Sequence, residues 1–175
     1  MLSLRPATAE HLAFCESLSR SNMAAYHAAR GIAWEPQLFL ASWAEFENFL
    51  IYSDDMLVGL LRMLAKQDTL EIRDLQLAPS HTGKGIGTWA IGRATTMAAE
   101  RGIPQLRLRV LEENPAHRLY LRLGFKAAGS VDGKVLMTLA VPPNRSFKPN
   151  PPRYADDPDG STLHSASDTT HGGSA

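Results

Sequence analysis

The chain has 175 residues, of which 44% are hydrophobic and 21% are charged, and its formal net charge at pH 7 is zero. This length favours one globular domain with a sizeable core and leaves too few residues for two full domains. No apolar run approaches the roughly 20 residues of a membrane span, and the first residues lack a basic stretch followed by an apolar core, so we expect a cytoplasmic protein without a membrane partner.

The N-terminal part of the chain predicts a strand and two helical regions. Residues 2–6 form the expected opening strand. Thr8 is the expected N-cap of a helix over residues 8–22, where apolar residues recur at helical spacing. The second helical region covers residues 22–48, and we expect a break in it near Gly31.

The middle of the chain predicts three consecutive antiparallel strands, because its apolar runs are separated only by short turns. The turns are expected at Asp54-Asp55 and near Asp68. The three strands are expected over residues 49–53, 56–67 and 70–78. A glycine-rich stretch, residues 82–88, then leads into a predicted helix over residues 85–101.

The next residues predict a strand, a short helix and a closing hairpin. These elements are expected over residues 105–111, 114–124, 125–131 and 134–141. From residue 142 the chain is rich in Pro, Ser, Asp and Gly and has almost no aliphatic side chains, so it cannot bury enough surface to offset the cost of ordering. We therefore expect one domain over residues 1–141 and a disordered tail over residues 142–175.

The stretch TGKGIGT, residues 82–88, is the first candidate binding site. A strand, a glycine-rich turn and a helix start place several free backbone N–H groups and the positive end of a helix dipole at one point, which suits an anion. Gly83, Gly85 and Gly87 would let a phosphate approach the backbone, and Lys84 adds a positive charge. A plain structural connection has the same composition, so the turn alone leaves both interpretations open.

Two nucleotide-binding motifs compete for this turn. The P-loop pattern fails because no lysine followed by Ser or Thr closes a six-residue loop bounded by glycines. Residues 85–90 fit the G-x-G-x-x-A pattern of dinucleotide binders, and Glu112 ends the next strand. That fold needs further strand–helix–strand units, whereas only a short helix and a hairpin follow. A nicotinamide dinucleotide is therefore the weaker interpretation.

A second motif, ENPAHRLYLRLGF over residues 113–125, follows the turn. With both motifs in this order, residues 2–141 resemble the GNAT superfamily of acetyl-CoA-dependent N-acyltransferases. In that family a Q/R-x-x-G-x-G/A turn holds the pyrophosphate of the cofactor. Thr82 stands here in place of the usual Gln or Arg, and the backbone donors of residues 83–88, including those of Ile86 and Thr88, do not depend on that side chain.

The resemblance implies where the rest of acetyl-CoA would lie. Its extended arm would pair with the strand edge near Leu75 and Leu77, where the strand over residues 70–78 splays from the strand over residues 105–111. The helix beside the thioester would carry the second motif, which in this chain is Asn114, Ala116, Tyr120, Gly124 and Phe125.

Tyr120 is the candidate general acid. Its phenol, with a reference pKa of roughly 10, is protonated at neutral pH and can donate to a departing thiolate. The alternative is an aromatic ring that packs the short helix onto the sheet. Asn114, which precedes Pro115, is either a helix N-cap or, as the resemblance implies, a hydrogen-bond partner of the pantetheine arm.

The strand LEIRDLQLA carries three charged residues, Glu71, Arg73 and Asp74, beside the predicted site of the general base. Glu71 lies eleven residues before Thr82, as does the glutamate base of the histone-acetylating branch of the superfamily, so we predict Glu71 as the base. A substrate ammonium with a pKa near 10.4 is rarely neutral at pH 7, so a carboxylate acting directly or through water would help. The alternative is a glutamate paired across the sheet.

Charge is divided unevenly along the chain. Residues 1–75 carry 6 Lys and Arg against 10 Asp and Glu, whereas residues 76–141 carry 9 against 4. A polyanionic cofactor held by the second part and a cationic acceptor held by the first would suit this division, although solvated faces also produce it. The acidic candidates for such an acceptor are Glu35, Glu45 and Glu47.

Together these features predict a mixed α/β fold of the GNAT type, with a mostly antiparallel central sheet, a splay between the fourth and fifth strands, and flanking helices. The predicted function is transfer of an acetyl group from acetyl-CoA to a primary amine of a small molecule or peptide by direct attack. No metal is expected, because the histidines and the single Cys15 lack ligand spacing. The alternative is a non-catalytic acyl-CoA-binding module. The basic residues form no long run, so no nucleic-acid partner is expected, and the resemblance allows a homodimer.

Overall fold

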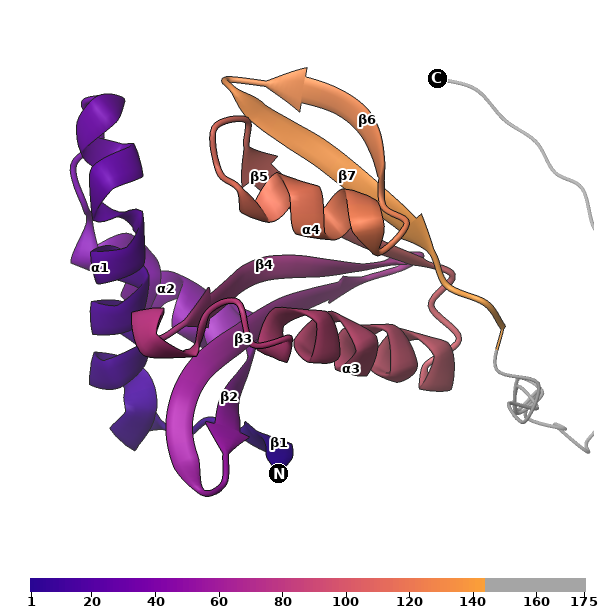
Figure 1. Ribbon diagram of the computed structural model, residues 1–175, viewed down its shortest axis with the longest axis horizontal. Helices are drawn as coiled ribbons and strands as arrows, with labels where there is room; N and C mark the ends of the chain where they lie inside the picture. The colour runs from indigo at the N-terminus through magenta and orange to yellow at the C-terminus, as the bar shows by residue number, and fades with distance from the viewer. Residues whose placement is uncertain (144–175) are drawn as a thin grey trace, which may run out of the picture.

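The computed structural model describes residues 1–143, which form a seven-stranded mixed sheet with helices on both faces (Figure 1). The strands are β1 Leu2–Pro6, β2 Glu47–Ser53, β3 Met56–Lys66, β4 Thr69–Leu77, β5 Gln105–Leu111, β6 Lys126–Val131 and β7 Lys134–Ala140. The helices are α1 Leu12–Ala29, α2 Pro36–Glu45, α3 Ile86–Glu100 and α4 Ala116–Arg122, with 3-10 turns at Ala9–His11 and Pro79–His81.

The order of the strands confirms the predicted mixed sheet. The order is β1-β2-β3-β4-β5-β7-β6, in which β4 and β5 are parallel and the other neighbouring strands are antiparallel. A dinucleotide-binding fold would instead place several parallel strands around the glycine-rich turn. The topology therefore argues against a nicotinamide dinucleotide at that turn.

The N-terminal helices divide at a different residue from the one predicted. α1 continues past Asn22, because the alanine-rich segment that follows consists of helix-forming residues without a breaker. The predicted break is confirmed at Gly31, which has a φ of +63°. Thr8 begins the first 3-10 turn rather than α1 itself, and its backbone N–H donates to His11 Nδ1 at 3.1 Å.

The sheet separates two hydrophobic clusters, one on each face. α1 and α2 cover one face, where Cys15, Phe39, Leu50 and Leu60 are buried together. α3 and Tyr120 of α4 belong to the cluster on the other face. Burial raises the pKa of the Cys15 thiol to about 11, so the thiol is protonated at neutral pH and packs as an apolar side chain.

A bulge in β4 decides which of its residues face α1. In the sequence LEIRDLQL, the adjacent polar residues Arg73 and Asp74 interrupt the alternation of apolar and polar side chains. The register between β3 and β4 shifts at this point, so β4 accommodates one extra residue. Beyond the shift, Leu75 and Leu77 pack on the α3 face, whereas Asp74 and Gln76 bond to residues of α1.

β4 and β5 pair over only three positions and then diverge. Residues Leu70 to Ile72 pair with Leu106 to Leu108, and within the described part of the chain the ladder ends there. Further along, β5 is paired with β7, while β4 keeps β3 as its neighbour. The predicted splay is confirmed, and within residues 1–143 it leaves one edge of β4 without a strand partner. That edge includes the backbone of Leu75 and Leu77.

Two predictions concern the ends of the chain and the membrane. The predicted tail over residues 142–175 lies outside the described residues, except for residues 142 and 143. Among the described helices, none combines the length and the apolar composition that crossing a membrane would require.

Candidate active site

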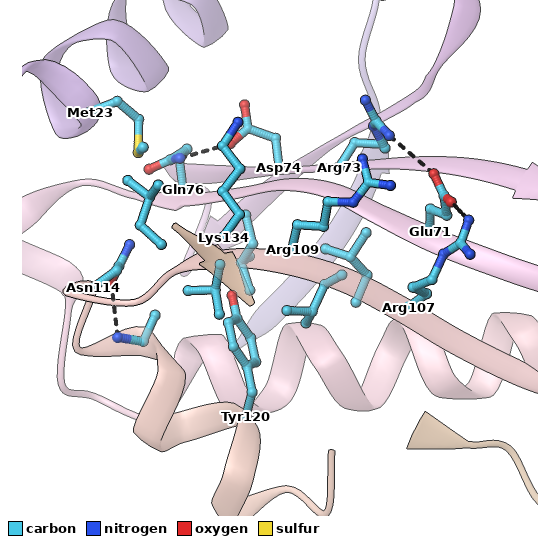
Figure 2. A pocket seen from close by; sticks show the side chains of 16 residues that line it. Met23, Glu71, Arg73, Asp74, Gln76, Arg107, Arg109, Asn114, Tyr120 and Lys134 are labelled. Carbon is cyan, nitrogen blue, oxygen red and sulfur yellow. Dashed lines mark hydrogen bonds and ion pairs between the residues drawn. The ribbon is translucent and has the colours of Figure 1, made fainter. Parts of the chain in front are cut away.

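A cavity of about 290 Å³ lies where β4 and β5 diverge (Figure 2). Its walls come from α1, β4, β5, α4 and β7. The predicted site residues that line it are Glu71, Leu75, Asn114, Ala116 and Tyr120. Leu77 and the glycine-rich turn, residues 82–88, do not line it, because they lie at the end of β4 and at the start of α3.

Tyr120 projects from α4 into the cavity, from the α3 side of the sheet (Figure 2). The residue is 8% exposed, and its ring packs edge-on against Phe125 with the ring centroids 5.7 Å apart. Burial, together with the negative charge of Asp74, raises the pKa of the phenol to about 12. The hydroxyl is therefore protonated throughout the neutral range, which is the state that a proton donor requires.

Asp74 reaches the same cavity from the α1 side of the sheet. Its carboxylate accepts hydrogen bonds from Ser19 Oγ at 2.8 Å and from Gln76 Nε2 at 2.7 Å, and it lies 3.8 Å from Arg62. Burial raises the pKa of Asp74, and the two hydrogen bonds and the Arg62 charge oppose that shift only in part. A carboxylate with a raised pKa inside a cavity has the properties of a general base.

Glu71, the predicted base, lies at the end of the cavity where β4 and β5 are still paired. Its carboxylate contacts three cations: Lys66 at 3.2 Å, Arg73 at 3.1 Å, and Arg107, its cross-strand partner on β5. Glu71 is only 5% exposed. Because both carboxylate oxygens are engaged, these contacts favour a structural role that holds β4 to β5. The role of Glu71 as the base stays a prediction.

Replacing Glu71 with Gln is expected to lower the stability of the folded protein. The substitution leaves three cations without their counter-charge, and we expect the free energy of unfolding to fall by about 1–3 kcal/mol, because the cations are themselves partly hydrated. Urea unfolding of Glu71→Gln measures this, with Glu100→Gln at the exposed end of α3 as the matched control. A pH–rate profile that lost its acid limb in Glu71→Gln would instead identify Glu71 as the base.

The glycine-rich turn has the backbone conformation that an anion site needs. Gly83 and Gly85 have φ values of +71° and +80°, which favour glycine, and Gly85 is the N-cap of α3. Within residues 1–143, the N–H groups of residues 83–88 donate to no backbone acceptor. A Cβ atom added to Gly83 or Gly85 would meet no atom within 4 Å, so the space above the turn is open. This geometry fits a pyrophosphate at the start of α3.

The side chains of the turn have different surroundings. Thr82 Oγ1 donates to the carbonyl oxygen of Pro79 at 2.9 Å, so this side chain closes the preceding 3-10 turn. Lys84 is exposed at the same turn. A Cβ at Gly87 would come within 3.2 Å of Leu119, so the absence of a side chain lets the start of α3 pack closely on α4. The turn therefore offers an anion its backbone donors and the charge of Lys84.

Asn114 precedes Pro115, the N-cap residue of α4, and its side chain caps the first turn of the helix, as one of its two predicted roles requires. Its Oδ1 accepts a hydrogen bond from the backbone N–H of Ala116 at 2.9 Å. The side chain also lines the cavity, and this bond leaves its amide nitrogen available as a donor. The cap and a contact with a pantetheine arm are therefore compatible.

The acidic residues proposed for a cationic acceptor lie elsewhere in the molecule. Glu47 forms two hydrogen bonds of 2.7 Å with Arg101. The cavity is not lined by Glu35, Glu45 or Glu47. It is lined instead by Arg109 and Lys134, which sequence reasoning missed because alternating polar positions look the same whether they face solvent or a cavity. In residues 1–143, no group of three or more His, Cys, Asp or Glu could hold a metal ion.

Known proteins that are similar to this chain are acetyltransferases. Residues 12–125 match the acetyltransferase (GNAT) family, and this segment includes the glycine-rich turn and Tyr120. Over 61 residues the chain is 44% identical to a streptothricin acetyltransferase of Streptomyces lavendulae. That alignment covers 34% of this chain and 32% of the relative, so the chain matches about a third of the length of that relative.

Two solved structures are similar in fold. A nourseothricin acetyltransferase is 31% identical, with a TM-score of 0.50 over 56% of this chain and 66% of that chain. The PaiA N-acetyltransferase of Thermoplasma acidophilum, solved in complex with coenzyme A, is 20% identical, with a TM-score of 0.66 over 80% of this chain and 99% of that chain. Since the family match covers more than half of the residues, this chain belongs to the acetyltransferase (GNAT) family.

Proposed function

We propose that this protein transfers an acetyl group from acetyl-CoA to a primary amine by direct attack, without a covalent enzyme intermediate. The observation that carries the proposal is the meeting of Tyr120 and Asp74 in one cavity at the splay, one from each face of the sheet. A protonated phenol and a carboxylate of raised pKa are the donor and acceptor of protons that aminolysis of a thioester requires.

The cofactor would be held mainly by backbone groups. The open N–H groups of residues 83–88 would bind its pyrophosphate, with Lys84 adding charge. The free edge of β4 near Leu75 and Leu77 would pair with the extended pantetheine arm, as an added strand does. The amide nitrogen of Asn114 would donate to the same arm. Thr82 would contribute through the local fold, since its hydroxyl is bonded to the main chain.

In the reaction, Asp74 would accept a proton from the substrate ammonium, directly or through water. The neutral amine nitrogen would attack the thioester carbonyl carbon, and a backbone N–H on the β4 edge would stabilise the oxyanion. When the C–S bond breaks, Tyr120 would donate its proton to the departing thiolate, which leaves as free coenzyme A, and the attacking nitrogen would lose its second proton to water, which leaves a neutral amide. A proton passed from Asp74 through water would restore the phenol.

The acceptor is a primary amine of a small molecule or a peptide. The relatives named as streptothricin and nourseothricin acetyltransferases support a small molecule, and the alignment with the streptothricin enzyme covers about a third of either chain. The cytoplasmic location and a homodimer stay predictions.

The proposal is tested by release of free thiol from acetyl-CoA. We expect acetyl-CoA to raise the melting temperature, and we expect thiol release that depends on an added amine from a panel of polyamines, amino acids, aminoglycosides, streptothricin and short peptides. A nicotinamide dinucleotide is the control ligand, and it should leave the melting temperature unchanged. Binding of acetyl-CoA without thiol release for any amine would favour the alternative, a non-catalytic acyl-CoA-binding module.

A further inference from the structure

Among residues 1–143, two cations that line the cavity form no ion pair with an acidic residue. Arg109 on β5 and Lys134 on β7 both line the cavity beside Asp74. Both also line a second hollow of about 250 Å³ on the β5–β7 surface. None of the ion pairs found within residues 1–143 includes either residue. The two side chains therefore line both hollows without an ion-pair partner among the described residues.

The strand register places Arg109 and Lys134 near each other on the α1 face of the sheet. Arg109 is opposite Leu136 and Lys134 is opposite Leu111, so the two cations are diagonal neighbours on one face, roughly 7–8 Å apart at their Cα atoms. The residues of β5 that alternate with Arg109, among them Leu108 and Val110, pack in the hydrophobic cluster on the α3 face. In Figure 2 the side chains of Arg109 and Lys134 extend toward the Asp74 side, opposite to Tyr120.

The carboxylates around this pair are mostly engaged elsewhere. Glu71 is held by three cations, and Glu113 forms two hydrogen bonds of 2.8 Å with Arg30. Glu112 accepts a hydrogen bond from Ser130. Asp132 lines the second hollow together with both cations. Within residues 1–143, neither Asp74 nor Asp132 forms an ion pair with Arg109 or Lys134. An anionic ligand between these two cations would therefore offset their mutual repulsion.

We propose that Arg109 and Lys134 form a subsite for a carboxylate of the acceptor, so that the preferred substrates are amino carboxylates rather than polycations. This inference rests on the proposed function, in which the amine of the same acceptor lies at Asp74. The acceptor thus meets one carboxylate and two cations, which complement an ammonium at one end and an anion at the other. Arg109 and Lys134 position the acceptor and take no part in proton transfer.

A phosphate of the cofactor has the same charge as a carboxylate and is the competing source of the anion. The geometry favours the acceptor, because the two cations are on the α1 face of the sheet. The glycine-rich turn, in contrast, opens at the start of α3, which packs on the other face. The two sources of the anion predict different effects of removing the cations. A carboxylate of the acceptor predicts a higher KM for the acceptor, whereas a phosphate of the cofactor predicts a higher KM for acetyl-CoA.

The test uses three amines that each have six carbon atoms and differ in the group at the far end: 6-aminohexanoate, hexylamine and 1,6-diaminohexane. We expect the highest kcat/KM for the aminohexanoate. Arg109→Gln and Lys134→Gln should each raise the KM for that acceptor about 10-fold, with kcat and the KM for acetyl-CoA unchanged. Neither variant should affect hexylamine, and the double variant Arg109→Glu/Lys134→Glu should favour the diamine. Lys126→Gln removes a charge from the same hairpin away from both hollows and is the matched control.

Each other outcome contradicts a different part of the proposal. A higher KM for acetyl-CoA in the Arg109 and Lys134 variants would assign the cations to a phosphate of the cofactor. Equal or better use of hexylamine or the diamine by the wild-type protein, or thiol release only with the polycations of the larger panel, would exclude a carboxylate subsite while leaving acetyl transfer intact. Absence of thiol release with every amine would instead contradict the proposed function.

Discussion

Phenylalanine in place of Tyr120 is expected to lower kcat for acetyl transfer by about 10²–10⁴-fold, which is the range that a positioned acid or base contributes. The ring packs against Phe125 and belongs to the core, so Tyr120→Phe keeps the packing and removes only the hydroxyl that faces the cavity. We therefore expect an unchanged melting temperature and an unchanged shift on addition of acetyl-CoA.

Thiol release under saturating substrates, with thermal unfolding as the check on folding, measures this effect. Tyr52→Phe is the matched control, because Tyr52 lies on β2 under the Arg5 guanidinium and away from the cavity. With its pKa raised to about 12, the phenol should stay protonated, so the wild-type rate should not fall between pH 7 and pH 10 through loss of the Tyr120 proton. An unchanged kcat in Tyr120→Phe would assign the proton donor to water or to another residue.

Asparagine in place of Asp74 is expected to lower kcat/KM by about 10²-fold or more and to change the pH dependence. The carboxylate must be ionised to accept a proton, so the wild-type rate should fall as pH drops through its pKa. Because burial raises that pKa, the acid limb should lie above the ordinary range of aspartate. In Asp74→Asn this limb should be absent. Asp68→Asn, in the exposed β3–β4 turn, is the matched control.

Asp74→Asn is also expected to change how the stability of the folded protein depends on pH. A raised pKa means that the native protein binds this proton more tightly than the unfolded chain does, so the contribution of Asp74 to stability declines as pH rises from the ordinary value through the raised one. Asp74→Asn removes that decline but leaves the buried Arg62 without its carboxylate neighbour at 3.8 Å. Urea unfolding at pH 4 and pH 8 should therefore show the variant gaining stability relative to the wild type at the higher pH.

Two results would contradict the assignment of Asp74. An acid limb that persists in Asp74→Asn and disappears in Glu71→Gln would return the base to Glu71, as the sequence alone suggested. A rate loss in Asp74→Asn without any change in the pH profile would indicate that Asp74 binds the substrate ammonium but does not take its proton.

The choice between Glu71 and Asp74 as the proposed base shows what sequence reasoning alone could not decide. Glu71 and Asp74 are three positions apart in one strand, and their spacing from the glycine-rich turn favours Glu71. Their surroundings are set by residues distant in sequence. Arg107 of β5 engages Glu71, whereas Ser19 of α1 and the bulge after Ile72 place Asp74 at the cavity.

Local patterns in the sequence determined the order of the elements, the glycine-rich turn and the cap at Asn114, because helix periodicity, positive φ angles and strand alternation depend on neighbouring residues. The splay was expected from the family resemblance and not from a local pattern. Only the tertiary structure decided which side chains share the cavity. The bulge in β4 and the register of β5 against β7 turn Asp74, Arg109 and Lys134 toward one space, and those pairings join residues far apart in the chain. Burial and charge, which set the pKa values of Tyr120 and Asp74, likewise arise only when the faces of the sheet are assembled.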